Sequence, residues 1–469
     1  MSEDYAATTI DAKFSHSVIS FRGDRSLSAD ELHTTAAAIR QILEGHGGRN
    51  WGVYVDSPFL QVATLIALQS LDRSAVLLPH AQPDFITGIA CEFDGLLLNG
   101  PVEQNTSIEL PALEILLEEG RSLAPITSKW QQTIGLMTSG SSGKPTQVIK
   151  TPAQVLSEVG MLETAFGHLI SGKRVFHGTT SHQHLFGFTF RVMWPLFTGR
   201  AFSDTQIRFP GEVSQSAGLR QKVVLISSPA FLSRARPLID LPQLSANDLT
   251  AFSSGGPLDT ATAVHFNQNA GITLVEIYGS TETGALASRV TRSPSDTPWL
   301  PLPGVEVDVD VDGILSAQAP HLPNGNWYKT EDRVALGSNE AFTLLGRKDR
   351  IVKVADKRVS LTELERLLIE RPEIDEARVF ELETGILGAV LIPAESGWTR
   401  VREIGKHHFL RDLRDHLSRT VERVTTPKRW RLLKHLPVNA QGKTELTTLT
   451  AAFFNTQIDP DWRVIRADA

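Results

Sequence analysis

Short apolar strands alternate with helical patterns along the first hundred residues of this chain. The runs Trp51 to Val55, Ser74 to Leu78 and Gly95 to Leu98 have the length and composition of buried strands. Apolar residues at helical spacing predict helices over 28–43, which opens with a capping-box sequence, and over 57–71. Strands that take turns with helices favour a mostly parallel sheet with helices on both faces. The expected fold class is therefore α/β.

The chain is long enough for more than one hydrophobic core. It has 469 residues, of which 41% are hydrophobic, and chains beyond roughly 250 to 300 residues usually divide into domains. We predict a large amino-terminal domain of mixed and parallel sheets over 1–346, and a small, mobile α+β domain over 347–469. A linker is expected at 345–350, and in the small domain we expect helices over 361–369 and 401–420.

Charge and cysteine content exclude several classes of protein. The formal net charge of −7 gives no broad basic face for nucleic acid. The single cysteine, Cys91, permits no internal disulfide, indicates a reducing compartment, and is predicted to be a buried small hydrophobe. No signal peptide, membrane span or zinc-site spacing is visible, which predicts a cytoplasmic location.

A segment rich in glycine and serine is the first candidate binding site. Thr138, Ser139, Gly140, Ser141, Ser142, Gly143 and Lys144 lie between two apolar runs, so a strand, loop and strand are expected. Glycines let backbone N–H groups converge, hydroxyl groups add donors and lysine neutralises charge, which suits a polyphosphate. The alternative is a solvated hairpin turn. A Walker loop is excluded, because Pro145 occupies the position of its Ser or Thr.

Three later strands each end in small polar residues. The run 222–226 ends at Ser227, the run from Ala251 ends in the turn with Gly255 and Gly256, and the run 274–277 leads to Tyr278-Gly279-Ser280-Thr281-Glu282-Thr283-Gly284. In open α/β sheets, ligands bind at the carboxyl ends of strands. The sequence therefore predicts a nucleotide-sized cleft at these strand ends.

The segment Ser181 to Phe188 contains two histidines followed by aromatic residues. No cysteine or acidic partner lies at a metal-ligand spacing, so a metal site is not favoured there. His184, followed by Leu185, Phe186 and Gly187, has two open interpretations. It is either a flat side chain that closes one wall of a ligand pocket or a structural histidine.

Taken together, seven segments in this order resemble the adenylate-forming superfamily, which contains acyl- and aryl-CoA synthetases, peptide-synthetase adenylation domains and luciferases. The segments are TSGSSGKPT (138–146), HLFG (184–187), SSGGPL (253–258), YGSTETG (278–284), YKTED (328–332), GRKDRIVKVADKRVSLTELE (346–365) and NAQGK (439–443). The resemblance covers nearly the whole chain. It implies that a carboxylate and ATP form an acyl-adenylate and pyrophosphate, after which a thiol accepts the acyl group.

The resemblance also implies roles for individual residues. The Gly/Ser segment with Lys144 would hold the β- and γ-phosphates, Thr281 would contact the α-phosphate, and Glu282 would bind Mg²⁺. Asp332 would accept the ribose hydroxyls, Arg347 would reach the nucleotide, and Gly255, Gly256 and Tyr278 would line the adenine slot. Lys443 would stabilise charge as the substrate carboxylate attacks; a surface salt bridge is its alternative. Asp349 would be the hinge about which the small domain rotates, bringing the face around Lys353 and Ala355 to the thiol.

The sequence departs from the family pattern at Asp356 and Glu331, both of which stand where glycine is usual. Asp356 bears on the thiol-transfer step. The acceptor implied is the phosphopantetheine thiol of CoA or of an acyl carrier protein. The expected walls of the acid pocket are His184, Phe186, Ser228 to Phe231, Ser253, Ser254 and Ile277 to Ser280. These residues include no obvious charged anchor for an amino group, which favours aryl or medium acyl acids over amino acids. The alternative function is a nucleotide-binding regulatory or scaffold protein that has the fold but little or no turnover. Lys144, Glu282, Asp332 and Lys443 together argue against it.

Overall fold

The computed structural model describes most of the chain and divides it into two compact units. The described residues are 17–99, 107–126, 129–138, 146–218, 222–238, 249–269, 272–293, 297–354, 357–383, 386–437, 444 and 446–454. The first unit comprises Met1–Glu306 with Gln318–Tyr328, and the second comprises Val307–Ala317 with Lys329–Ala469. This division falls earlier in the chain than the predicted boundary at 346/347, which remains a prediction together with its hinge.

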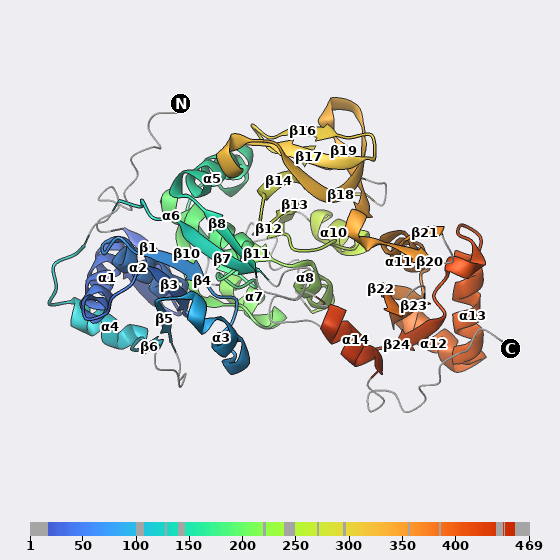
Figure 1. Cartoon of the computed structure of the whole chain (residues 1–469), viewed down its shortest axis with the longest axis horizontal. Helices are drawn as coiled ribbons and strands as arrows, with labels where there is room; N and C mark the ends of the chain where they lie inside the picture. Colours follow the sequence, from blue (N-terminus) through green and yellow to red (C-terminus); the bar gives the residue numbers. More distant parts are fainter. Residues whose placement is uncertain are drawn as a thin grey trace. The chain divides into compact units, whose positions relative to one another are not determined.

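A six-stranded sheet forms one layer of the first unit. Its strands, in spatial order, are β6 (Ser107–Glu109), β5 (Gly95–Leu98), β3 (Asn50–Tyr54), β4 (Ser74–Leu77), β7 (Ile134–Thr138) and β8 (Thr146–Lys150). All neighbours are parallel except β7 and β8, which are antiparallel and flank the Gly/Ser segment. Helix α1 (Ala29–Glu44) packs on α2 (Pro58–Gln69) and α4 (Leu113–Gly120), and α2 packs on β4 (Figure 1).

The predicted helix starts in this layer are confirmed. The Ser28 hydroxyl accepts a hydrogen bond from the Glu31 N–H, and the Ser28 N–H donates to the Glu31 carboxylate, which is a complete capping box. Every residue of α2 is buried, in keeping with its apolar sequence. Cys91 differs from the prediction: it is exposed, because it lies in the short turn Ala90–Glu92 that contains no buried residue.

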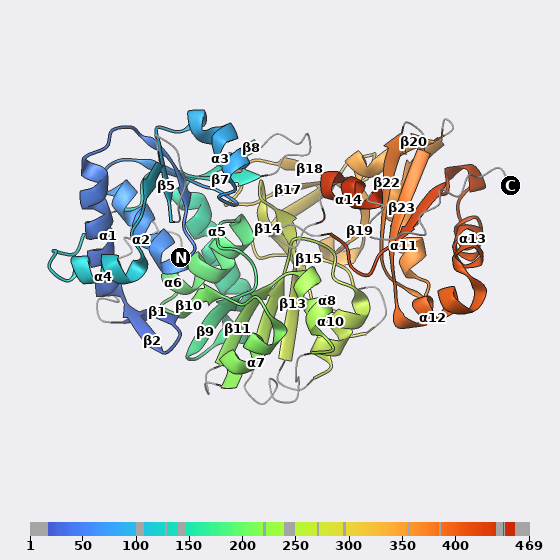
Figure 2. The same ribbon diagram turned by 90° about the horizontal axis from the view of Figure 1, so that it is seen from below.

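A nine-stranded sheet forms the second layer of the first unit. Its order is β15 (Leu300–Pro301), β14 (Gly284–Arg289), β13 (Ile272–Ser280), β12 (Leu249–Ser253), β11 (Lys222–Ser227), β9 (Arg174–Gly178), β10 (Ala201–Gln206), β1 (Val18–Arg22) and β2 (Arg25–Ser28). The strands from β13 to β1 are parallel, and the edges are antiparallel. Helices α7 (Pro210–Gly218) and α10 (Thr260–Asn267) pack on β11 and β13 (Figure 2). The expected α/β class with mixed and parallel sheets is confirmed.

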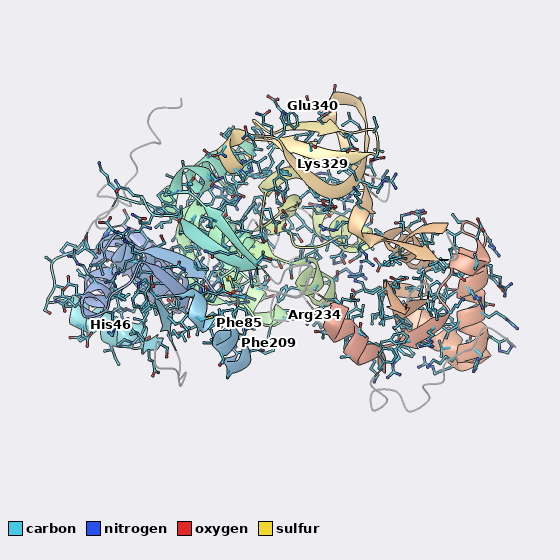
Figure 3. All side chains as sticks on the ribbon, viewed as in Figure 1. His46, Phe85, Phe209, Arg234, Lys329 and Glu340 are labelled. Atoms are coloured by element: carbon cyan, nitrogen blue, oxygen red, sulfur yellow. The ribbon has the colours of Figure 1, made fainter. Side chains whose placement is uncertain are left out.

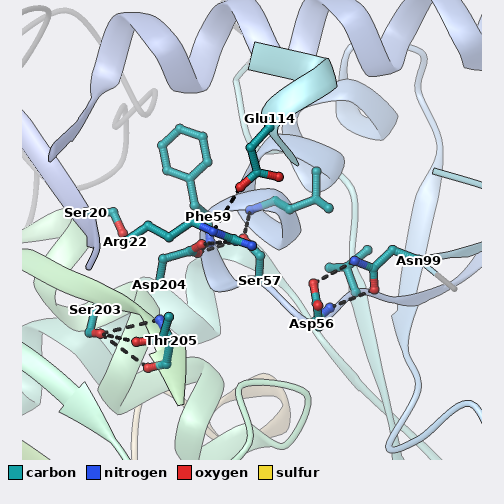
Figure 4. A network of polar contacts seen from close by, with 12 residues as sticks. Ser20, Arg22, Asp56, Ser57, Phe59, Asn99, Glu114, Ser203, Asp204 and Thr205 are labelled. Atoms are coloured by element: carbon teal, nitrogen blue, oxygen red, sulfur yellow. Dashed lines mark hydrogen bonds and ion pairs between the residues drawn. The ribbon is translucent and has the colours of Figure 1, made fainter. Parts of the chain in front are cut away.

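Asp204, on β10, links the two layers of the first unit. Its carboxylate accepts hydrogen bonds from the Ser57 hydroxyl at 2.7 Å and the Phe59 N–H at 2.8 Å, at the start of α2. The Arg22 guanidinium donates to it at 2.9 Å and also pairs with Glu114 (Figure 4). Burial raises the pKa of Asp204, and these hydrogen bonds partly offset that effect.

A π-helix, Gly187–Met193, follows the histidine segment and continues into α6 (Trp194–Phe197). Its Arg191 is fully buried and donates to the carbonyl groups of Thr180, Ser203 and Thr205. Burial lowers the pKa of Arg191 to about 10. The close approach of Gly187 to the preceding turn requires glycine, because a Cβ there would lie 2.0 Å from the Ser181 carbonyl oxygen.

The described residues of the second unit form three small sheets. The first has the order β16 (Glu306–Val309), β17 (Ile314–Gln318), β18 (Tyr328–Leu336) and β19 (Phe342–Arg347). Lys329 lies on this sheet (Figure 3) and forms an ion pair with Asp310. The other two sheets are β20 (Ile351–Val354) with β21 (Lys357–Ser360), and β22 (Ile374–Glu383) with β23 (Ile386–Pro393) and β24 (Arg429–Leu432). Helices α11 (Leu361–Ile369), α12 (Glu395–Ile404) and α13 (Lys406–Leu417) complete a separate core, and α14 (Leu446–Phe454) ends the described chain.

Two expectations about this unit are wrong. The predicted linker at 345–350 is strand up to Arg347, which is paired with β18, and then a short 3₁₀ turn, Lys348–Arg350. The single helix expected over 401–420 is two helices, because Gly405 adopts a φ of +80° and ends the first of them. The helix at 361–369 is confirmed.

Candidate active site

The carboxyl ends of β11, β12 and β13 lie side by side in the nine-stranded sheet. Ser227 is paired with Ser253, which in turn is paired with Glu276. The turn with Gly255 and Gly256 follows β12 directly, and both glycines are exposed. The sequence-based expectation that these strand ends meet at one edge of the sheet is therefore realised in the structure.

The segment after β9 joins the same edge. The Thr179 hydroxyl group lies 2.9 Å from that of Ser227, and the Thr179 N–H donates to the Ile226 carbonyl. Farther along, the His182 Nε2 atom lies 2.8 Å from the carbonyl oxygen of Val55, and the Gln183 side chain donates to the same oxygen. The half-buried His184 follows at once. Its two possible roles stay open.

Burial and Arg191 keep two histidines of this region neutral. Burial lowers the pKa of His182 to about 3 and that of His177 to about 4, and the nearby Arg191 charge acts in the same direction. Neutral rings beside a buried guanidinium add no further positive charge to the interior. The sequence identified this histidine segment, but it gave no sign of the π-helix and its arginine.

The turn from Ser280 to Gly284 connects β13 with the antiparallel strand β14. The Thr283 hydroxyl accepts from the Ser280 N–H at 3.0 Å and donates to the Gly284 carbonyl at 2.9 Å. A Cβ on Gly279 would lie 2.0 Å from the Gly284 carbonyl oxygen, so the two strands need glycine there. Thr281 and Glu282 project from this turn and are half-buried.

Lys150 and Glu158 hydrogen-bond to the backbone of this turn and of Ala285, contacts that sequence reasoning did not predict. The Lys150 ammonium group donates to the Glu282 carbonyl oxygen at 2.7 Å, and the Ala285 N–H donates to Glu158 at 2.9 Å. Both side chains are buried. Burial raises the pKa of Glu158 and lowers that of Lys150, while each charge favours the ionised form of the other. The only local signal was a lysine at the buried end of a strand.

A tilted aromatic contact supports Tyr278, the predicted wall of the adenine slot. The rings of Tyr278 and Trp299 have centroids 5.7 Å apart, and the Arg289 guanidinium lies 4.5 Å from the Trp299 ring centroid. Two hydrogen bonds, of 3.0 and 2.8 Å, join Arg289 to the buried Glu276. A chain of contacts therefore runs from the bidentate Arg289–Glu276 pair on β14 and β13 through Trp299 to Tyr278.

Asp332 and Arg347 lie together in the second unit, where they face each other across β18 and β19. The Asp332 N–H donates to the Thr330 hydroxyl, which itself donates to the Leu315 carbonyl at 2.9 Å. Asp332 is half-buried and Arg347 is exposed. The two predicted nucleotide-binding residues are thus neighbours on one sheet.

Several predicted site residues lie outside the described residues. These are Ser139, Gly140, Ser141, Ser142, Gly143, Lys144 and Lys443, as well as Ala355 and Asp356. Thr138 ends β7, but its side chain is not described, and neither are those of Asp349 and Lys353. The roles expected of these residues remain predictions.

Glu282 is the one predicted metal ligand. Among the described residues, no three histidine, cysteine or acidic side chains converge as a protein-only metal site. Mg²⁺ is commonly bound through one or two carboxylates together with substrate phosphate oxygens and water. A single half-buried carboxylate on the turn that precedes β14 fits that kind of site, with the remaining ligands supplied by the nucleotide and solvent.

The amino-acid sequence is similar to those of known AMP-binding enzymes and CoA ligases. The profile of the AMP-binding enzyme family matches residues 101–318. A 4-coumarate–CoA ligase of Cereibacter sphaeroides is 26% identical over 311 residues, which cover 65% of this chain and 68% of that protein. An anthranilate–CoA ligase of Pseudomonas aeruginosa is 25% identical over 342 residues, covering 65% of this chain and 64% of that one. The matched part therefore spans about two thirds of these relatives.

Solved structures share the fold over almost the whole chain. A benzoate CoA ligase of Burkholderia xenovorans superposes with a TM-score of 0.75 at 17% identity, covering 94% of this chain and 98% of that one. The fold is therefore shared with solved CoA ligases. The match of residues 101–318, which include the strand-end site, to the AMP-binding enzyme family agrees with the resemblance that the sequence motifs predict. No helix within the described ranges is both long and apolar enough to cross a membrane.

Proposed function

We propose that this protein is an ATP-dependent carboxylic acid ligase, which forms an acyl- or aryl-adenylate with release of pyrophosphate and passes the acyl group to a phosphopantetheine thiol. The observation that carries the proposal is that two turns follow neighbouring strands. The Thr281–Glu282 turn follows β13, and the Gly255–Gly256 turn follows β12, which pairs with β13. The match of residues 101–318 to the AMP-binding enzyme family and the similarity to two CoA ligases support it.

The first step joins two anions, so the site must supply orientation and positive charge rather than a strong nucleophile. In the proposal, the adenine lies against Tyr278 and the two glycines, where a missing side chain permits close approach. Thr281 orients the α-phosphate, and Glu282 holds Mg²⁺, which neutralises phosphate charge when bound. Lys144 and Lys443 add the two cations nearest to the reacting groups.

Asp332 and Arg347 complete the nucleotide site in the proposal. An ionised carboxylate has two acceptor oxygens and can accept both ribose hydroxyl groups. Arg347, on the neighbouring strand, would contact the same nucleotide. The acid pocket would be formed by residues at and after several strand ends: His184, Phe186, Ser228 to Phe231, Ser253, Ser254 and Ile277 to Ser280. A pocket of aromatic and small residues suits aryl or medium acyl acids better than amino acids.

Acid-dependent pyrophosphate release tests the first step. The folded protein with Mg–ATP is assayed across a panel of aryl and aliphatic acids, and we expect release with at least one of them. If a correctly folded sample releases none with any acid, the ligase proposal is wrong. Once an accepted acid is known, the thiol acceptor is found by comparing CoA with a holo acyl carrier protein in the same assay.

A further inference from the structure

Two buried side chains, Lys150 and Glu158, hydrogen-bond to the backbone of the Ser280–Gly284 turn and of Ala285, which follows it. Lys150 is only 2% exposed and its ammonium group reaches the Glu282 carbonyl oxygen at 2.7 Å. Glu158 is 3% exposed and accepts from the Ala285 N–H, three residues farther along the backbone. The two side chains thus hydrogen-bond to the backbone at Glu282, before Thr283, and at Ala285, after it.

The Glu158 carboxylate also explains the residue at the end of the turn. Gly284 has a φ of +73°, and a Cβ on it would lie 2.8 to 3.0 Å from the carboxylate atoms of Glu158. Glycine alone combines that backbone conformation with that contact. The turn and the buried carboxylate are therefore shaped to each other.

Lys150 additionally connects two segments that the sequence identified separately. It is the last residue of β8, the strand that follows the Gly/Ser segment, and its bond to Glu282 spans 132 residues of sequence. Glu158 lies on α5 (Pro152–Phe166), whose first turn is fixed by a capping box between Thr151 and Gln154. The support of the turn is thus a rigid strand-to-helix junction.

Burying two charges is costly, because each loses its hydration. A neutral side chain would suffice to accept the Ala285 N–H, so backbone support alone does not account for a buried lysine and a buried carboxyl group at this turn. The ammonium group also lies close enough to Glu282 and Glu158 for both carboxylates to favour its charged form. A fixed positive charge beneath an acidic turn is useful where that turn must hold a metal-bound polyphosphate.

We propose that Lys150 and Glu158 are positioning residues that hold the Thr281–Glu282 turn in the conformation that binds Mg–ATP. This inference rests on the proposed function, since it assigns a purpose to the same site. Neither residue contacts the nucleotide in the proposal. They act through the backbone of Glu282 and Ala285, and they tie that backbone to the strand that follows the Gly/Ser segment.

The test measures binding of a fluorescent ATP analogue with Mg²⁺ and, separately, with EDTA. The variant Lys150→Met keeps the length of the side chain and removes its charge and its hydrogen bond. We expect it to weaken Mg-nucleotide binding about tenfold, the scale of one charge-assisted hydrogen bond, and to change binding in EDTA by no more than about twofold. Lys173→Met, which removes an exposed lysine of the same unit, should bind like the wild type.

The double variant Lys150→Met/Glu158→Gln separates positioning from plain stability. It removes both buried charges while leaving an amide oxygen to accept from Ala285, so it should recover most of the melting temperature lost in Lys150→Met. We expect its Mg-nucleotide affinity to stay about tenfold low. Should affinity return together with melting temperature, or should the folded Lys150→Met protein bind like the wild type, the inference is overturned.

If Lys150→Met does not fold, the Mg-nucleotide affinity of the double variant is sufficient to test the inference. Failure of the proposed function has a different signature, because the wild type itself would then neither bind Mg-nucleotide nor release pyrophosphate with any acid. A wild type that is active, together with a double variant of unchanged Mg-nucleotide affinity, would reject only the positioning role.

Discussion

Asp332 and Arg347 are directly opposite each other in the antiparallel pair β18–β19. Cross-strand neighbours of opposite charge lie close enough to act on one ligand. The adjacent Glu331 points to the other face of the same strand, since successive side chains of a strand alternate. Asp332 and Glu331 therefore form a natural comparison between a predicted ribose ligand and a surface carboxylate.

Asp332→Asn should weaken ATP binding by about ten- to a hundredfold. The substitution removes the charge that strengthens two hydrogen bonds from the ribose, each worth roughly 1.5 to 3 kcal/mol when one partner is charged. Glu331→Gln, on the opposite face, should leave binding within about twofold of the wild type. Isothermal titration calorimetry with ATP measures the dissociation constant of each variant. Equal effects of the two substitutions would contradict the role of Asp332.

Lys443→Ala should leave ATP binding intact and slow adenylation by about a hundredfold or more, because this ammonium group is expected to stabilise charge in the transition state only. Lys434→Ala, which removes an exposed lysine of the same unit, is the control. Single-turnover pyrophosphate release and nucleotide titration separate the two quantities. An unchanged adenylation rate would remove the catalytic assignment of Lys443.

Gly256→Ala tests the adenine slot without disturbing the fold. A Cβ at Gly256 meets no atom within 4 Å and the residue has no positive φ, so stability should not change. A methyl group facing the base should raise the KM for ATP about tenfold. Gly160→Ala, at another open position, should leave that KM unchanged. Thermal melts and initial rates measure the two effects, and an unaltered KM in Gly256→Ala would place the base elsewhere.

Asp204→Ala should destabilise the protein by about 3 kcal/mol, because it leaves the Arg22 charge and the Ser57 and Phe59 donors without their shared acceptor. Asp204→Asn should cost less, since its amide oxygen can still accept from Ser57 and Phe59. Burial already raises the pKa of Asp204, which lessens what its charge contributes. Denaturant unfolding at neutral pH measures both. A larger loss of unfolding free energy in Asp204→Asn than in Asp204→Ala would contradict the role of these hydrogen bonds.

His182 should make the protein less stable in acid. Its pKa is about 3 in the folded chain and about 6.5 when unfolded. The unfolded state therefore binds the proton first, and stability is lost as the pH falls from about 6.5 toward 3. Between pH 7 and pH 5 the loss from this group is about 2 kcal/mol.

The variant His182→Gln should lose about 2 kcal/mol less than the wild type over the same interval, because it has no group to titrate there. Its amide can donate to the Val55 carbonyl in place of the ring. His46→Gln, at an exposed surface position (Figure 3), should lose as much as the wild type. Unfolding curves at pH 7 and pH 5 for the three proteins give the comparison.

The elements that followed from the sequence are those with a strong local pattern. The buried runs at Gly95–Leu98 and Lys222–Ser227 and the helix at Leu361–Ile369 carry both apolar spacing and clear ends. The break at Gly405 was missed because charged residues at helical spacing continue across it. A glycine inside such a pattern gives too weak a signal to end a helix on its own.

The residues of the candidate site also fall into those that the sequence predicts and those that it does not. Gly255, Gly256, Tyr278, Thr281 and Glu282 could be placed because each follows a recognisable strand, and parallel neighbours end at one edge. Lys150, Glu158 and Arg191 could not, because their partners are distant in sequence or are backbone carbonyl groups. Contacts of that kind leave no period or spacing in the chain.

The reversal of direction from β13 to β14 has one further consequence. In nucleotide sites where a strand leads into a helix, the amino end of that helix supplies partial positive charge to the phosphates. Here the corresponding turn leads into an antiparallel strand, so that source of attraction is missing. The polyphosphate affinity of this turn therefore depends on the Thr281 hydroxyl, ionised side chains and a metal ion, which makes it more sensitive to ionic strength than a helix-capped site.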